Sequence, residues 1–229
     1  MVVSQVSKPQ RKRGRQQRRV SVTRQKLVEA ARAVFAERGF DLTRIDEITD
    51  RADVGKGTFY KHFRTKEQLI NELIKGVLGE LVAVIEARCS NTSDLKDFLE
   101  KLLDVHVDFF EKRWEDFVIY FQGRTDLTLQ VSYSGIETPF LAYLERVEVL
   151  LASVLKYRLP KPVLRRVVCA LAGFVSGYYS FAVISSQDEE IDKTFRPLRD
   201  AMVGSLARFI QEAAPSGESN EAVGGVKTG

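Results

Sequence analysis

A short polar segment, DRADVGKGTFYKHF (Asp50–Phe63), carries residues suited to binding a phosphate-rich partner. On a helix of about 3.6 residues per turn, Phe59 and Phe63 share one face and can pack against neighbouring helices. Gly57 and Lys61 point the opposite way, so the outward face combines an ammonium group with a position that has no side chain. A lysine can bind a phosphate or a guanine edge, and a glycine lets another surface approach the backbone closely. The segment favours a helix that contacts DNA, and a solvent-exposed connector with ordinary polar groups is the alternative.

Hydroxyl groups and helix N-termini add to this surface. Thr58 and Tyr60 flank the outward face, and their hydroxyls can bind phosphates. Thr43 and the pair Thr65-Lys66 stand at expected helix N-termini, where backbone N–H groups favour an anion. These positions predict further anion contacts around the short helix.

The spacing of apolar residues predicts the helices that must position this segment. A first helix begins at Thr23 and ends at Gly39, and a second opens at Thr43 with Asp46 as its capping partner. The short third helix covers about 56–62, and Thr65 opens a long fourth helix. Further helices are expected near 94–113, 114–124, 137–158, 161–184 and 192–212. The predicted fold class is therefore all-α.

A helix, a tight turn containing glycine and a second short polar helix form a helix-turn-helix, here at about 44–63. The surrounding segment Thr23–Ile74 resembles, without a gap, the N-terminal DNA-binding domain of TetR-family transcriptional regulators. The Phe-x-x-x-Gly-Phe end of the first helix and the Lys-Gly-Thr-Phe-Tyr-x-His-Phe block carry the resemblance. It implies a three-helix N-terminal DNA-binding domain followed by a helical C-terminal regulatory and dimerisation domain.

The resemblance also implies which residues contact DNA, mostly through phosphates. They are Thr43, Lys56, Gly57, Thr58, Tyr60, His62 and Lys66, to which the outward-facing Lys61 and the neighbouring Arg44 are added. Two positions depart from the family pattern, because Asp53 stands where glycine is common and Gly55 where serine or threonine is common. The carboxylate of Asp53 is unfavourable near DNA, and Gly55 lacks a hydroxyl that could cap the helix and bind a phosphate. We expect these departures to alter operator preference or lower affinity.

The charges are distributed unevenly along the chain. The 229 residues carry a formal net charge of +4, but residues 1–70 hold 17 Lys and Arg against 8 Asp and Glu. The first 24 residues contain eight basic and no acidic residues, and such a run favours a disordered arm over residues 1–20. The arm is either a solubilising tail or a segment that lies along phosphates. The remaining boundaries are predicted at 21–81 for the DNA-binding domain, 82–212 for an effector-binding and dimerisation domain, and 213–229 for a flexible tail.

Aromatic residues are dense in the first half of the C-terminal part. Together they could line an apolar cavity for a small effector, although for any single one of them core packing is the favoured interpretation. His106 and Arg113 could orient a polar or anionic end of the ligand. The candidate pocket residues are His106, Phe109, Phe110, Arg113, Trp114, Phe117, Tyr120, Phe121, Phe140 and Tyr143.

The segment VVCALAGFVSGYYSFAVI (Val167–Ile184) contains no charged residue. Its length just reaches that of a membrane span, but its glycines, serines and tyrosines favour a helix buried on both sides. In the resembling family the last two large helices pair with their twofold mates as a four-helix bundle, so the resemblance implies a dimer interface here. The candidate interface residues are Gly173, Phe174, Gly177, Tyr178, Phe181, Met202, Leu206 and Phe209.

Several classes of protein are disfavoured. The sequence has no Gly-x-Ser-x-Gly, no glycine-rich phosphate loop ending in Lys-Ser/Thr and no metal-spaced His/Cys cluster, so we expect no enzyme, metal or cofactor. It has no apolar N-terminal signal segment, and its two cysteines, Cys89 and Cys169, are far apart. We therefore expect a cytoplasmic protein with reduced thiols and no membrane insertion.

The sequence thus predicts a homodimeric transcriptional regulator that binds double-stranded DNA. We expect a repressor that is released from a pseudo-palindromic operator by a small apolar or amphipathic effector. The alternative is a DNA-marking interaction protein whose helical body binds a protein partner instead of a small ligand.

Overall fold

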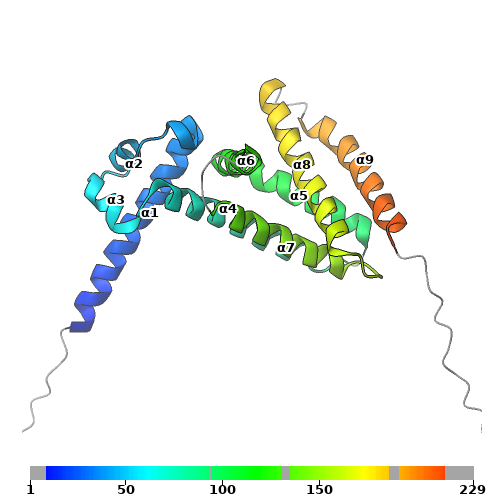
Figure 1. The fold of residues 1–229 in the computed structure, drawn as a ribbon, viewed down its shortest axis with the longest axis horizontal. Coiled ribbons are helices and arrows are strands. Elements are labelled where there is room, and N and C mark those ends of the chain that lie inside the picture. The colour runs from blue at the N-terminus through cyan, green and yellow to red at the C-terminus, as the bar shows by residue number, and fades with distance from the viewer. Residues whose placement is uncertain (1–8, 93, 130–134, 186–190, 215–229) are drawn as a thin grey trace, which may run out of the picture. The chain divides into compact units, whose positions relative to one another are not determined.

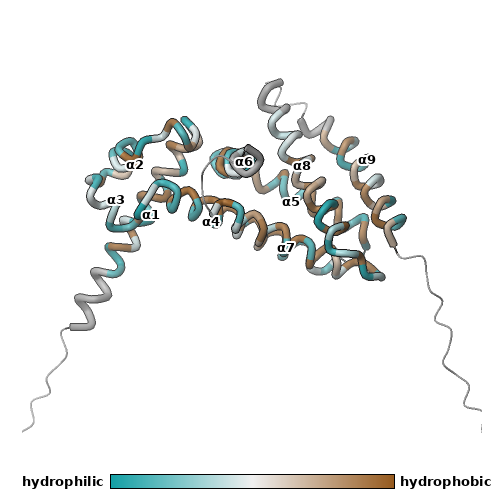
Figure 2. The backbone as a smooth tube through the Cα atoms, viewed as in Figure 1, coloured by the Kyte–Doolittle hydropathy of each residue, from teal (hydrophilic) through white to brown (hydrophobic). Residues whose placement is uncertain are grey.

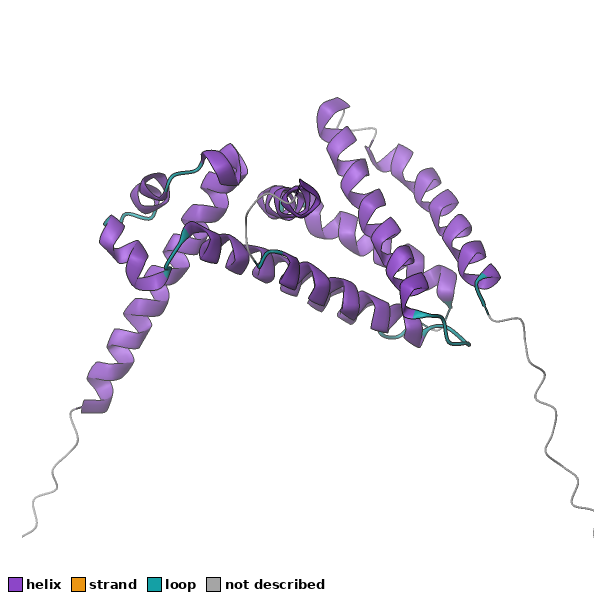
Figure 3. Cartoon of the chain, viewed as in Figure 1, coloured by secondary structure: helices purple, strands orange, loops and turns teal. Residues whose placement is uncertain are grey.

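The computed structural model describes residues 9–92, 94–129, 135–185 and 191–214, without the side chains of 9–16, 126–129, 181–185 and 191–194. Within these ranges the chain forms helices and no strand, which confirms the all-α prediction (Figure 1, Figure 3). The helices belong to two compact units, each made of two stretches of sequence. The first comprises Met1–Val84 and Val107–Tyr143, and the second comprises Ile85–His106 and Leu144–Gly229.

The first unit holds the N-terminal helices. They are α1 (Pro9–Leu42), α2 (Ile45–Arg51), α3 (Lys56–His62) and most of α4 (Lys66–Cys89), joined by α6 (Trp114–Leu129) and the start of α7 (Glu137–Ser153). The sequence placed the end of the DNA-binding domain near residue 81, whereas the structure also groups residues 107–143 with these helices. The reason is the packing of α6 against α1, which a boundary drawn along the sequence does not reveal.

A continuous apolar core holds the first unit together. Leu27 and Phe35 of α1, Ile48 of α2, Phe59 of α3 and Leu73 of α4 are fully or almost fully buried. Figure 2 shows hydrophobic residues recurring along α4, the helix that follows α3 in the sequence. The buried positions follow the 3.6-residue spacing expected of helices with one apolar face.

The N-terminal arm is helical where it is described. We expected residues 1–20 to be disordered, but α1 begins at Pro9 and continues without interruption into the packed part of the helix (Figure 1). Arg, Lys and Gln are good helix formers, and extending an existing helix avoids the unfavourable nucleation step. Residues 1–8 lie outside the described range, as do residues 215–229 of the expected tail.

The predicted caps of the N-terminal helices hold with one correction, whereas α6 ends at Leu129 and not near 124, and α7 ends at Ser153 and not near 158. Gly39 has φ 83°, a conformation that favours glycine, and it terminates the regular part of α1 as predicted. The N-cap of α2 is Arg44 and not Thr43, and the Arg44 N–H donates to the Glu47 carboxylate at 2.8 Å. The start of α4 is confirmed, because the Gln68 N–H donates to the Thr65 hydroxyl at 3.2 Å.

The second unit contains α5 (Leu95–Glu111) up to His106, most of α7, and the helices α8 (Lys161–Ser185) and α9 (Ile191–Glu212). Arg199 of α9 forms an ion pair with Asp104 of α5 at 2.6 Å, and Arg165 of α8 pairs with Glu148 of α7. The Tyr157 hydroxyl donates to the Ile210 carbonyl at 3.2 Å. Among the described residues, no helix has both the length and the apolar character needed to cross a membrane.

Candidate nucleic-acid interface

Two phenylalanines and an arginine fix α3 in place. Phe59 and Phe63 are buried, as their spacing predicted, with ring centroids 5.6 Å apart. The Arg24 guanidinium of α1 lies over the Phe63 ring at 4.9 Å and forms an ion pair with Glu72 of α4. The C-terminal end of α3 is therefore fastened to both α1 and α4, which gives its other face a defined orientation.

The outward face of α3 is polar and accessible. Lys56, Gly57 and Lys61 are exposed, and Tyr60 is 52% exposed even though its ring touches Phe59 edge-on. A Cβ atom built on Gly57 would meet no other atom within 4 Å, so no intramolecular contact requires glycine there. A glycine at this position would allow another molecule to approach the backbone of α3 closely. Thr58 and His62 lie at the edges of this face and are half-buried.

The turn between α2 and α3 contains both departures from the family pattern. Asp53 adopts φ 53°, a left-handed conformation in which a side chain is strained and glycine is favoured. Gly55 is the N-cap of α3 and provides no side-chain hydrogen bond to the helix. The turn still closes, because the Val54 N–H donates to the Thr49 carbonyl at 3.0 Å and the Thr58 N–H to the Gly55 carbonyl at 2.7 Å.

An acidic residue on α2 faces the first basic residue of α3. The Asp46 carboxylate lies 2.8 Å from the Lys56 ammonium and 3.6 Å from the Arg44 guanidinium. The hydrogen bond from Lys56 lowers the pKa of Asp46 below its usual value, and the same bond raises the pKa of Lys56. All three groups are largely solvent-exposed, so the pair is screened and weak and can exchange for a phosphate contact. Sequence reasoning assigned Asp46 only to helix capping and missed this contact.

Two predicted phosphate contacts have their polar atoms engaged inside the domain. Thr43 is only 2% exposed, and its hydroxyl donates to the Gly39 carbonyl at 2.7 Å. The Lys66 ammonium donates to the Phe40 and Thr43 carbonyls at 2.6 and 3.0 Å. Both side chains therefore close the junction between α1, α2 and α4. Arg44, by contrast, is exposed beside this junction.

Helix α6 contacts α1 through two sets of polar side chains that the sequence did not indicate. The Gln122 amide accepts a hydrogen bond from the Phe40 N–H at 2.8 Å and donates to the Phe35 carbonyl at 3.3 Å. Near the start of α6, Arg32 of α1 forms an ion pair with Asp116, whose side chain is almost completely buried. Burial raises the pKa of Asp116, and the nearby guanidinium groups of Arg32 and Arg113 partly offset that effect. No periodicity or motif marked Gln122, since its hydrogen-bond partners, Phe35 and Phe40, lie more than eighty residues away in the sequence.

The aromatic residues expected to line a ligand pocket are mainly packed core. The rings of Phe110, Phe117, Tyr120 and Phe140 contact one another with centroids 5.2 to 5.6 Å apart, and all four are buried. Phe109 and Tyr143 are also buried, whereas Trp114 and Phe121 are partly exposed on α6.

The two candidate polar pocket residues belong to different units. Arg113 and Trp114 line a charged cleft of about 660 Å³ together with Arg32, Glu80 and Asp116. His106 is buried in the second unit, where its Nδ1 donates to the Leu102 carbonyl at 2.6 Å. Burial lowers the pKa of His106 to about 4, so its ring is neutral at pH 7.

The candidate dimer residues lie on α8 and α9. Phe174 and Tyr178 contact Phe195 of α9, with ring centroids 5.9 and 4.7 Å apart, so they pack the two helices of one chain together. Leu198 and Phe209 of α9 are exposed large apolar residues. Gly173, Gly177, Met202 and Leu206 are half-buried, and the side chain of Phe181 lies outside the described residues.

A metal site is not found in the described part of the chain, where no three His, Cys, Asp or Glu side chains are grouped to hold an ion. The first unit therefore exposes Gly57, Tyr60 and Lys61 on one face of α3, while Phe59 and Phe63 fix the opposite face.

Comparison with known proteins supports this assignment. Residues 27–73 match the model of the family described as bacterial regulatory proteins, tetR family. The transcriptional repressor KstR2 of Mycobacterium tuberculosis is 33% identical over 118 residues, which cover 52% of this chain and 59% of the repressor. The TetC protein of transposon Tn10 from Escherichia coli is 38% identical over 96 residues, covering 41% of this chain and 49% of TetC. The matched parts therefore span about half to three fifths of these relatives.

Solved structures extend the likeness of fold further along the chain. The transcriptional regulator FadR from Bacillus subtilis, determined in complex with stearoyl-CoA, superposes with a TM-score of 0.60. The alignment covers 80% of this chain and 96% of FadR at 20% sequence identity. At this identity the likeness concerns the fold alone.

Proposed function

Because the chain belongs to the tetR family of bacterial regulatory proteins, we propose that it is a homodimeric repressor whose α3 enters the major groove of DNA. The construction of α3 supports this most strongly. Phe59 and Phe63 bury one face, and the opposite face presents Gly57, Tyr60 and Lys61 to the solvent. Such a regulator acts in the cytoplasm, where bacterial DNA lies, and it performs no catalysis.

The operator is expected to be pseudo-palindromic. Two copies of α3 related by a twofold axis would occupy successive major grooves with centres about 34–36 Å apart. The exposed Leu198 and Phe209 on α9 support a pairing of α8 and α9 with the same helices of a second chain.

A small apolar or amphipathic effector would release the repressor from DNA. The relatives named as repressors support repression, and the structure of FadR in complex with stearoyl-CoA supports regulation by a small molecule. Such a ligand can shift the DNA-bound population only by its difference in affinity between the two conformational states.

Selection of genomic fragments by the purified protein at physiological salt tests the proposal. The comparison is a variant that carries Tyr60→Ala and Lys61→Ala, and the control is Lys96→Ala, an exposed lysine on α5. We expect the wild type and the control to enrich a shared inverted repeat that the double variant loses. Uniform, salt-sensitive enrichment without a motif would contradict a site-specific regulator and indicate a nonspecific DNA binder.

A further inference from the structure

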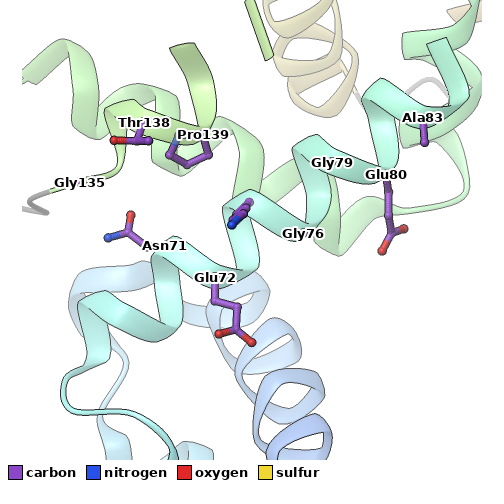
Figure 4. A pocket seen from close by; sticks show the side chains of 10 residues that line it. Asn71, Glu72, Gly76, Gly79, Glu80, Ala83, Gly135, Thr138 and Pro139 are labelled. Carbon is purple, nitrogen blue, oxygen red and sulfur yellow. The ribbon is translucent and has the colours of Figure 1, made fainter. Parts of the chain in front are cut away.

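A groove on the first unit lies between α4 and the start of α7 (Figure 4). Its volume is about 810 Å³, within the range of about 300–1,000 Å³ typical of small-molecule sites. The wall on α4 extends from Asn71 to Ala83, and Thr138 and Pro139 of α7 lie opposite Asn71. None of the aromatic residues predicted to bind a ligand lines this groove.

Two glycines leave helix backbone bare in the groove wall. Gly76 and Gly79 lie one turn apart on α4, and a Cβ atom at either would meet nothing within 4 Å. Each glycine in a helix interior costs about 1 kcal/mol relative to alanine, so the pair weakens α4 without improving its packing. With Ala83 and Pro139 they provide a shallow apolar wall that admits a flat, apolar body.

The charges in the groove are unevenly compensated. The Glu72 carboxylate is paired with Arg24, and the Glu80 carboxylate is paired with Arg113. Among the described residues no carboxylate forms an ion pair with the Lys75 ammonium, which is exposed at the same wall. The groove therefore offers one uncompensated positive charge beside an apolar surface.

We propose that this groove binds an amphipathic organic anion, whose apolar body lies against Gly76, Gly79 and Pro139 and whose charged group faces the Lys75 ammonium. A small ligand fits better than a helix of a partner protein, because Glu72 and Glu80 flank the glycines with long polar side chains (Figure 4).

The site adjoins the contacts that orient α3. Glu72 borders the groove and pairs with Arg24, and the Arg24 guanidinium lies over the Phe63 ring at the end of α3. An anion bound next to Glu72 disfavours the present position of that carboxylate by like-charge repulsion and so acts on Arg24. Binding of a ligand in the groove is thereby coupled to the orientation of α3. This coupling rests on the proposed function, whereas binding of the ligand in the groove does not.

Fluorescence titration with 8-anilinonaphthalene-1-sulfonate, an aromatic anion, tests the site in the full chain without DNA. We expect Lys75→Gln to weaken binding about two- to fivefold, as for one exposed ion pair. Gly79→Leu places a side chain in the groove and should weaken binding about tenfold or more, whereas Gly79→Ala should weaken it much less. Lys26→Gln, an exposed lysine on α1, is the matched control for charge and should leave affinity unchanged.

Circular dichroism shows whether each variant remains folded, and Lys75→Gln tests the site even if Gly79→Leu does not fold. Absence of binding to the wild type would overturn the proposal. Equal affinities of wild type, Lys75→Gln and Gly79→Leu would overturn it too, because the probe would then lie elsewhere. DNA affinity measured with and without the probe tests the coupling separately. If the probe binds but DNA affinity does not change, the coupling is refuted and the site stands.

Discussion

The Asp46 carboxylate of α2 lies 2.8 Å from the Lys56 ammonium at the start of α3. An acidic side chain on one helix of the helix-turn-helix thus neutralises a cation that the sequence assigned to DNA. A phosphate that approaches Lys56 must replace Asp46, and the released carboxylate remains close to the polyanion. We therefore expect the pair to lower affinity for DNA in general and to leave the fold unaffected, since both groups are solvent-exposed.

Replacing Asp46 by asparagine removes this competition. We expect Asp46→Asn to bind DNA about two- to fivefold more tightly at low salt, because Lys56 and Arg44 then meet phosphates without a competing carboxylate. The slope of log affinity against log salt should become steeper by up to about 0.9. Fluorescence anisotropy over a salt series measures both. Glu37→Gln, which disrupts the exposed pair with Arg51, is the control, and equal affinities for Asp46→Asn and wild type would refute the argument.

Gly57→Ala should separate stability from DNA binding. Alanine has the higher helix propensity, so thermal unfolding should show a stability gain of up to about 1 kcal/mol. The added methyl group meets no atom of the protein but would stand between α3 and a closely approaching duplex, so affinity should fall. Gly204→Ala on α9, also with open space around its Cβ, should show a comparable gain in stability. Unchanged DNA affinity of Gly57→Ala would mean that the backbone of α3 does not approach DNA closely.

Asp53→Gly should relieve strain in the turn. Asp53 adopts φ 53°, and glycine accepts this conformation without a steric penalty. After allowance for the more flexible unfolded chain, we expect a stability gain of about 0.5–1 kcal/mol. Asp50→Gly, at the end of α2 and in helical conformation, should instead destabilise the protein. Chemical denaturation measures both, and effects of the same sign would contradict the strain argument.

The helices were predictable where local patterns determine them. The spacing of Phe59 and Phe63 indicated the buried face of α3, and the short third helix was placed within the bounds observed, Lys56–His62. Gly39 ended the regular part of α1 as expected, because a residue with positive φ at the end of a helix is a local requirement. These features depend on residues a few positions apart, which a sequence displays directly.

Long-range pairings were not predictable. Gln122 contacts Phe40 near the end of α1, and Asp116 contacts Arg32, across separations of more than eighty residues. A sequence does not distinguish aromatic residues that surround a cavity from aromatic residues that pack against one another. In the structure, the rings of Phe110, Tyr120 and Phe140 pack together. The groove between α4 and α7 was missed because the apolar part of its wall includes two glycines, which carry no chemical signal in a sequence.

Deleting residues 1–20 should weaken DNA binding. The deleted part carries seven of the eight basic residues that precede residue 25, and α1 is helical from Pro9. We expect weaker affinity at low salt and a flatter salt dependence, by about 0.9 for each phosphate that the arm would otherwise bind. Arg18→Gln combined with Arg19→Gln, two exposed positions of α1, should show part of the effect without shortening the helix. An unchanged salt slope after the deletion would show that the arm only aids solubility.

Acid should destabilise the second unit through His106. Burial lowers the pKa of this side chain from 6.5 to about 4 in the folded protein. Below pH 6.5 the unfolded chain binds a proton that the folded chain excludes, so the stability provided by the neutral ring is complete above that pH. It is lost as the pH falls towards 4.

His106→Gln preserves a donor for the Leu102 carbonyl and removes this titration. Between pH 7 and pH 4.5 the wild type should lose roughly 2–3 kcal/mol more stability than the variant. Urea unfolding at a series of pH values measures the difference, with His62→Gln on α3, outside the core, as the control. Parallel stability curves for wild type and His106→Gln would mean that the buried ring gains its proton in the folded protein without penalty.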